Sequence, residues 1–217
     1  MFDNVRFDLL QDALIDTIYM TFVTLIFVLV FGFLIGYVLY LTESKKGILK
    51  VVHQLLVFLT NIARSIPFLI LMILIMPLTK QIIGTILGSS AAIPALVISA
   101  TPFYARLVYQ SLREIPKSII EMLESLGKTT TQMTPILLKE SLPGLISGLV
   151  ITSVTLIGFT SISGVIGAGG LGHLAYQSGF VKNDQTMILL STLTVLALVF
   201  LIQGIGDFVV KKIDKRL

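Results

Sequence analysis

Long apolar runs separated by short polar connections dominate this chain of 217 residues. A helix needs ~20 apolar residues to cross the hydrocarbon core of a bilayer, and five runs reach that length. They cover residues 17–42, 55–78, 91–112, 142–166 and 185–206. The pattern therefore predicts an all-α polytopic membrane protein with five transmembrane helices. Pro94 and Pro102 are expected to kink the third of them.

The longest polar interruption, residues 113–141, contains a short amphipathic pattern. Its apolar residues recur at helical spacing, at Ile115, Ile119, Met122 and Leu126. Pro116 is tolerated in a first turn, and Gly127 stands where a left-handed residue would end the helix. About ten residues make a rod of ~15 Å, half the thickness of a bilayer core. We expect this helix to lie at the membrane surface, either to bind another protein or as a surface helix without a partner.

Composition supports the membrane class. Hydrophobic residues make up 55% of the chain and charged residues 13%, against ~45–50% and ~25% in soluble domains. The absence of cysteine excludes a disulfide framework and a thiolate metal site. The net charge of +4 comes from lysines and arginines at the ends of apolar runs rather than spread over a surface, which argues against nucleic-acid binding.

The positions of the 16 lysines and arginines predict the orientation. Five spans place the termini on opposite sides of the membrane. Arg64 apart, the basic residues divide into twelve on one side and three on the other, which are Arg6, Lys80 and Lys182. The more positive side of a membrane protein faces the cytoplasm. Residues 1–16 are then an external N-terminal segment, the loop 113–141 lies inside, and residues 211–217 form a basic cytoplasmic tail.

Several kinds of chemistry are absent from the sequence. Gly127, Lys128 and Thr129 resemble the end of a phosphate-binding loop, but position 122, where that motif needs a glycine, is methionine. The two histidines lie on opposite faces of the membrane, so no metal site is expected. The spans hold no pair of carboxylates, such as ion-coupled carriers place at the midplane. With no catalytic pair either, the chain is not expected to be an enzyme, and energy for active transport must come from a separate subunit.

A candidate path through the membrane involves the second and fourth spans. Arg64 lies well inside an apolar run; it either snorkels from a helix end, pairs with a carboxylate or lines an inner vestibule. The fourth span is rich in small and hydroxyl residues, which suit close helix packing or a polar path. Its candidate path and gate residues are Thr155, Ser161, Ile162 and Ser163. Ile162 is expected near a constriction, because rings of apolar side chains can close a pore by dewetting.

The cytoplasmic loop also carries a motif. Glu121 and Gly127, six residues apart before the penultimate span, resemble the Glu-Ala-Ala loop of ABC importer permeases. This sequence departs from that pattern, because Met122 and Leu123 replace the two alanines and Pro143 lies three residues after the usual position of the loop's proline. Three further runs resemble the methionine ABC importer permease family: Arg64-Ser65-Ile66-Pro67-Phe68, Pro102-Phe103 followed by Arg106, and Gly167-Ala168-Gly169-Gly170-Leu171-Gly172 followed by Tyr176 and Gly179. By this resemblance residues 17–210 form an ABC transporter type I transmembrane domain.

The resemblance implies a homodimeric permease of the bacterial inner membrane that moves methionine by alternating access. Two copies would supply ten helices around a twofold axis, where five are few to enclose an amino acid. It also implies an ATPase subunit dimer, which would bind ATP and Mg²⁺ while this chain holds no cofactor, and a substrate-binding lipoprotein or periplasmic protein. The residues expected to contact the ATPase are Ile119, Glu121, Met122, Leu123, Leu126 and Gly127. The alternatives are an ABC permease for another small solute, such as glycine betaine or phosphonate, and a passive channel.

Overall fold

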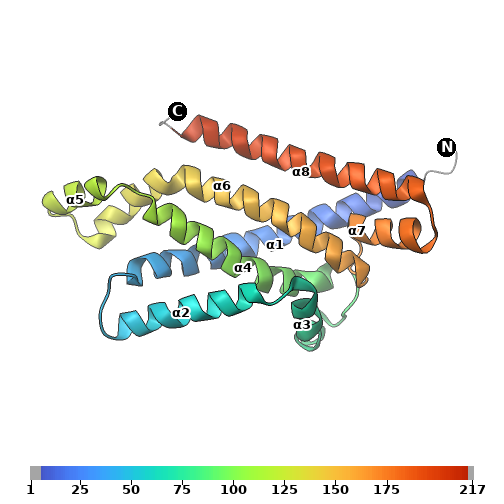
Figure 1. The fold of residues 1–217 in the computed structure, drawn as a ribbon, viewed down its shortest axis with the longest axis horizontal. Helices are drawn as coiled ribbons and strands as arrows, with labels where there is room; N and C mark the ends of the chain where they lie inside the picture. The colour runs from blue at the N-terminus through green and yellow to red at the C-terminus, as the bar shows by residue number, and fades with distance from the viewer. Residues whose placement is uncertain (1–5, 215–217) are drawn as a thin grey trace.

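The computed structural model describes residues 6–214, and every regular element in that range is a helix (Figure 1). In chain order the elements are α1 (Phe7–Thr42), α2 (Ile48–Ser65), α3 (Phe68–Ile83), α4 (Ser89–Arg113), α5 (Lys117–Ser125), α6 (Thr130–Val165), α7 (Gly170–Leu174), the π-helix η1 (Ala175–Val181) and α8 (Gln185–Ile213). The predicted all-α class is therefore confirmed.

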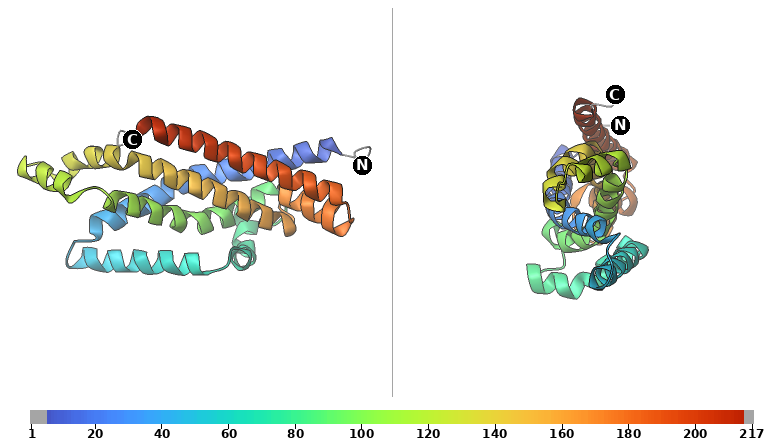
Figure 2. Two further views of the ribbon diagram at one scale, coloured as in Figure 1. Left: turned by 45° about the horizontal axis from the view of Figure 1, so that its top comes forward. Right: turned by 90° about the vertical axis from the view of Figure 1, so that its left-hand side faces the viewer.

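The long helices run along one elongated bundle (Figures 1 and 2). The turn between α1 and α2, the helix α5 and the C-terminal end of α8 lie toward one end of the bundle. The N-terminal end of α1, α3 and α7 lie toward the other end. The segments that carry the twelve basic residues of one predicted side thus gather at one end of the bundle, as far as the structure describes them.

Four helices, α1, α4, α6 and α8, are each long and apolar enough to cross a membrane, and the pair α2 and α3 makes a fifth span if it is counted as one. Residues 55–78, predicted as the second span, are divided between α2 and α3, which meet at a bend of 106°. Ile66 is extended at the break, with φ −81° and ψ 122°. Pro67 is the physical reason, since a proline lacks the N–H that would continue the helix and disfavours helical backbone in the residue before it.

Other helices are longer than the apolar runs. Helix α1 begins at Phe7, within the segment predicted to be external, α6 begins at Thr130 rather than near residue 142, and α8 continues to Ile213. Charged residues end an apolar run without ending the helix, since their side chains extend into water while the backbone bonds continue. The glycine-rich segment between the fourth and fifth predicted spans is also helical, as α7 and η1.

Helices α1 and α4 form the most extensive contact in the bundle. A Cβ atom added at Gly36 would lie 2.5 Å from the Ala105 carbonyl oxygen and 2.7 Å from the Val108 Cβ, and one added at Gly32 would lie 2.9 Å from the Tyr104 ring. Small residues of this kind let the backbones of membrane helices approach closely, which strengthens their van der Waals contact.

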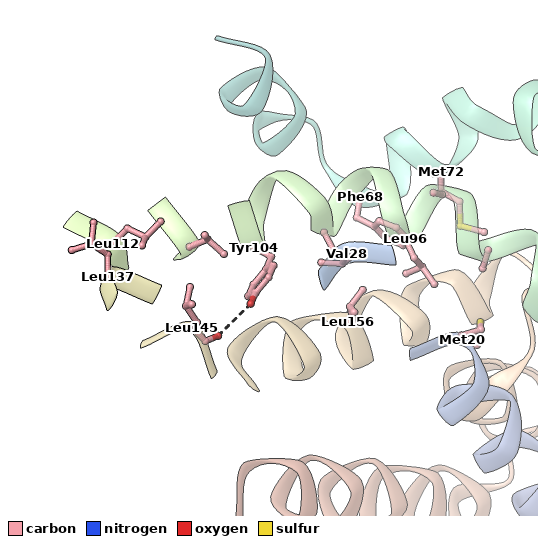
Figure 3. Close-up of a cluster of buried hydrophobic side chains, with 14 of the residues drawn as sticks. Met20, Val28, Phe68, Met72, Leu96, Tyr104, Leu112, Leu137, Leu145 and Leu156 are labelled. Atoms are coloured by element: carbon pink, nitrogen blue, oxygen red, sulfur yellow. Dashed lines mark hydrogen bonds between the residues drawn. The ribbon is translucent and has the colours of Figure 1, made fainter. Parts of the chain in front are cut away.

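The core lies between α1, α4 and α6, with α3 packed on one side (Figure 3). Met20, Val28, Leu96 and Leu156 are fully buried in it. The Tyr104 hydroxyl donates a hydrogen bond of 3.4 Å to the Leu145 carbonyl. In contrast, α2 buries no residue and α8 buries three. These two helices therefore leave apolar surface for lipid or for another protein chain.

Candidate functional site

The short helix α5 extends beyond the main bundle at one end (Figure 1). One apolar side of α5 faces the rest of the chain, and its Leu123 is 2% exposed. Ile115, two residues before the helix begins, is 5% exposed. Leu123 belongs to the same buried cluster as Leu112 of α4 and Leu137 of α6. The helix is therefore attached to the core rather than suspended in a free loop.

The opposite side of α5 is open. Met122 is 54% exposed and Leu126 is 68% exposed, four residues apart on one face, and Glu121 beside them is exposed. Ile119 is partly buried against the core. Leu123, which is also predicted to contact a partner, is buried within this chain in this structure. We call the exposed set Glu121, Met122, Leu126 and Gly127 the docking face.

A left-handed glycine ends α5, as predicted. Gly127 has φ +70°, and its N–H donates to the Glu124 carbonyl at 2.9 Å while the Lys128 N–H donates to the Leu123 carbonyl at 3.2 Å. These two bonds form the Schellman pattern that satisfies the last carbonyls of a helix. Two residues later a capping box between Thr129 and Gln132 begins α6. The turn between the two helices is thus held at both ends by specific hydrogen bonds.

The predicted path residues of α6 lie on different sides of that helix. Ile162 is 39% exposed and Thr155 is half-buried. They belong to a stripe in which Ile151, Gly158 and Val165 are also exposed. This spacing of three and four residues marks one open helix face. The two residues predicted to border a path therefore lie on a face of α6 that is accessible in this chain.

The predicted serines are used in packing. The Ser161 hydroxyl donates to the Ile157 carbonyl at 3.0 Å, and the Ser163 hydroxyl donates to the Phe159 carbonyl at 2.9 Å. Ser163 is fully buried, and a Cβ atom added at Gly172 would collide with the Ser161 backbone. Close contact between α6 and α7 therefore explains these small residues, and Ser163 is not accessible from the surface of this chain.

Arg64 lies beside a polar cavity between α2 and α4 of about 470 Å³. Its polar lining residues are Asn61 and Arg64 from α2 and Arg106 and Gln110 from α4. Val57, Phe103 and Leu107 supply its apolar wall. The sequence reading named Arg64 alone among them as a candidate. Helical spacing places positions 103, 106, 107 and 110 on one face of α4, but no feature of the neighbouring sequence indicates that α2 packs beside that face.

Helix α4 is also joined to the end of α1, at the end of the bundle that holds α5. The Arg113 Nε lies 3.3 Å from the Glu43 carboxylate, which links α4 to the end of α1. The guanidinium groups of Arg106 and Arg113 lie 5.3 Å and 5.5 Å from the centre of the Tyr109 ring. Cation–π contacts of this kind stabilise the positions of both arginines.

Neither histidine lies near an acidic cluster. His53 Nδ1 is 3.1 Å from the Leu39 carbonyl and 3.2 Å from the Thr42 hydroxyl, and His173 Nδ1 is 2.9 Å from the Gly164 carbonyl. Both rings thus join neighbouring helices. Over residues 6–214 there is no group of three histidine, cysteine, aspartate or glutamate side chains that could hold a metal ion.

A bundle of apolar helices with one span broken near an arginine, and a short helix held outside it, defines a membrane transport subunit. The family described as binding-protein-dependent transport system inner membrane component matches residues 32–217, and the chain belongs to that family.

Named relatives extend this assignment. The methionine import system permease protein MetP of Bacillus subtilis is 48% identical over 99% of this chain and 98% of its own length. The probable D-methionine transport system permease protein MetI of Vibrio cholerae is 39% identical over 96% of this chain and 94% of its own length. The resemblance to methionine permeases drawn from the motifs is therefore confirmed.

Solved structures share the fold. A chain of the MetNI methionine ABC transporter in an inward-facing conformation is 38% identical, covers 96% of this chain and 98% of its own length, and has a TM-score of 0.92. A chain of an amino acid ABC transporter crystallised with histidines has a TM-score of 0.68 at 21% identity, over 97% of this chain and 95% of its own length. The second likeness concerns the fold alone.

Single cysteines can separate the open stripe of α6 from its packed side, because the natural chain contains none. We expect Thr155→Cys and Ile162→Cys to react with a charged, membrane-impermeant thiol reagent in the purified protein, since both positions are accessible and would face a water-filled path. Ser163→Cys, a change of similar size at a buried position, is the control and should stay unreactive. If all three resist the reagent, the stripe faces lipid or another chain and the path lies elsewhere.

Proposed function

We propose that this chain is the permease subunit of an ATP-driven importer that moves methionine and close analogues into the cell. The strongest single support is the 48% identity to the Bacillus methionine permease over nearly the whole of both chains. The inward-facing methionine transporter chain supports the same assignment at the level of the fold. The active unit would be a homodimer of this chain in the inner membrane.

ATP hydrolysis would take place in a partner. The run ending at Thr129 has a methionine where a phosphate-binding loop needs glycine, and in the structure this run forms a helix cap instead. We infer that an ATPase dimer, which binds ATP and Mg²⁺, docks on the face of Glu121, Met122, Leu126 and Gly127. A substrate-binding lipoprotein or periplasmic protein would deliver the amino acid on the other side of the membrane.

The contacts of α5 suggest how a movement of the ATPase would reach the membrane. A partner bound to Met122 and Leu126 pushes on a helix whose other face buries Leu123 against α4 and α6. Because a packed core transmits displacement rather than absorbing it, a shift of α5 would move both helices together. The open stripe of α6 and the polar cavity on α4 would then change their access to the two sides of the membrane.

The electrostatics of the α2–α4 cavity also support a water-filled path on that side of the chain. Arg64 lies 14 residues beyond Lys50 on α2, which is about 21 Å at ~1.5 Å per residue. Charged side chains at membrane depth almost always face a bundle interior or a water-filled cavity, because exposure to hydrocarbon is costly. The face of α2 and α4 that carries Arg64 and Arg106 would therefore border the path rather than lipid.

Uptake of labelled methionine tests the proposed function. Membrane vesicles that hold this chain, its ATPase and its binding protein should accumulate methionine only when ATP is supplied. Accumulation without ATP would indicate a channel. ATP-dependent uptake of glycine betaine or a phosphonate, with no uptake of methionine, would assign a different substrate to the same permease fold.

The docking face can be tested at Gly127. A β-branched residue is disfavoured at a left-handed position and costs of order 1–3 kcal/mol of strain, so Gly127→Val should fray or tilt α5. We expect loss of ATPase co-purification and of uptake while the variant still inserts. Gly127→Asn is the control, since asparagine tolerates this backbone and nothing lies within 4 Å of an added Cβ. Full assembly and uptake by Gly127→Val would show that α5 is not the docking element.

Glu121→Ala should weaken uptake only partly, because exposed ion pairs contribute ~0–1 kcal/mol.

The orientation is a separate prediction. A cysteine in place of Lys182 should react with an impermeant reagent added to intact cells, and one in place of Glu121 should react only after the membrane is opened. Both positions are exposed, so accessibility within the chain does not limit either reaction. The corresponding positions nearer the termini, Asp3 outside and Lys215 inside, lie beyond the described residues. Labelling of position 121 from outside would reverse the topology and remove the basis for docking.

A further inference from the structure

We propose that the α2–α4 cavity is a transient binding site for the transported amino acid, with Arg64 and Arg106 receiving its carboxylate. This inference rests on the proposed function and adds to it a place inside the permease where the substrate is recognised by its main-chain groups. The observation that carries it is the meeting of two arginines and two amide side chains around a single cavity of about 470 Å³.

The first step of the argument is that both guanidinium groups have free capacity. Among residues 6–214 the ion pairs join Arg6 to Asp8 and Arg113 to Glu43, and neither involves Arg64 or Arg106. The Arg106 guanidinium carbon lies 5.3 Å from the centre of the Tyr109 ring, a cation–π contact that involves no carboxylate. A charge held in a membrane span without a carboxylate partner marks a functional site in such proteins.

The second step is the fit to a carboxylate. A guanidinium presents planar pairs of N–H donors that match the two oxygens of a carboxylate, and the charge-assisted bonds are stronger than neutral ones. The arginines come from two different helices, α2 and α4, that line the same cavity. A carboxylate bound in this cavity would have a donor from each helix.

The third step concerns the rest of the ligand. Asn61 and Gln110 each carry an amide oxygen that can accept a hydrogen bond from an ammonium group. Val57, Phe103 and Leu107 supply apolar wall for a side chain. Cavities of ~300–1,000 Å³ are typical of small-molecule sites that combine an apolar lining with a few polar groups. The cavity thus provides a counterpart for each part of a zwitterionic amino acid with an apolar side chain.

The fourth step is the position of the helix break. Arg64 lies in the last turn of α2, two residues before the extended Ile66 that separates α2 from α3. Non-helical backbone at membrane depth is tolerated only inside protein or beside a water-filled cavity. A change in the angle between α2 and α3 would move Arg64 relative to Arg106, so the site could be formed in one conformation and opened in another. Because the site forms in only one of the two conformations, its overall affinity for the ligand would be low, which suits a site that must release its ligand.

The experiment uses the permease–ATPase complex in nanodiscs of phosphatidylcholine, with binding of labelled L-methionine measured without nucleotide or binding protein. We expect saturable binding that L-methioninol, which lacks the carboxylate, displaces roughly tenfold more weakly than methionine does. Arg64→Gln and Arg106→Gln should each weaken methionine binding by roughly tenfold or more and abolish the difference between the two ligands. Arg106→Lys should restore part of the affinity, because a lysine keeps the charge but not the paired donors.

Lys50→Gln is the matched control, since it removes one positive charge from the same helix at a position that does not line the cavity. It should leave methionine binding unchanged. Equal binding by the Lys50 and Arg106 variants and the wild-type protein would overturn the proposed site. Loss of affinity in all variants alike would overturn it as well, because the effect would then follow net charge rather than the cavity.

A lipid headgroup is the other source of an anionic group. Retention of phosphatidylglycerol that depends on Arg64 and Arg106, without methionine binding in phosphatidylcholine, would assign the arginines to lipid and overturn the substrate site. Failure of the proposed function gives a different result, namely no methionine uptake by the wild-type complex. In that case, carboxylate-dependent binding of other labelled amino acids that needs both arginines would support the cavity, and its absence would overturn it.

Discussion

The close contact between α1 and α4 is the interaction on which the remaining helices depend. In a bilayer, helices gain little from hiding apolar surface from lipid, so they associate through dense packing and hydrogen bonds. Gly32 and Gly36 let α4 approach until its backbone nearly touches α1. Helix α4 then carries contacts to α2, α3 and α6 on its other faces. Both the polar cavity and the base of α5 are therefore placed by this single helix pair.

The second organising feature is that α5 has apolar residues on two sides, one buried against its own chain and one exposed. Its inward residue Leu123, like Ile115 just before the helix, is part of the core of this chain, while Met122 and Leu126 are exposed. A helix with only one apolar face could bind a partner or its own chain, but not both. The two stripes give α5 the form needed for an element that receives a movement on one side and passes it to α4 and α6 on the other.

The broken second span leaves a polar cavity beside α2. Pro67 interrupts the helix, and the stacking of Phe68 on Phe159, with ring centres 4.6 Å apart, fixes the start of α3 against α6. Helix α2 is left at the margin with no buried residue, and its Arg64 lines the same cavity as Arg106 of α4. A pair of arginines that would be costly against lipid thus lines a cavity between two helices.

Features set by neighbouring residues could be determined from the sequence alone. Apolar runs established the membrane class and the all-α fold, and the spacing around Met122 with a glycine at position 127 established α5 and its end. These depend on hydrophobic periodicity and backbone freedom, which act over a few residues. Pro67 is a helix-breaking residue that the sequence shows, but the apolar residues on both sides of it predict a single span.

Only the tertiary structure decided features that depend on contacts between distant segments. It buried Leu123 in the core and left Met122 exposed, and it buried Ser163 while leaving Ile162 exposed. It also brought Arg106 and Arg64 to the lining of one cavity. Helical spacing identifies the residues that share a face, but it does not say which face meets which neighbour. That choice is made by the shapes of whole helices as they pack, and here the glycines of α1 and the angle at Pro67 decide it.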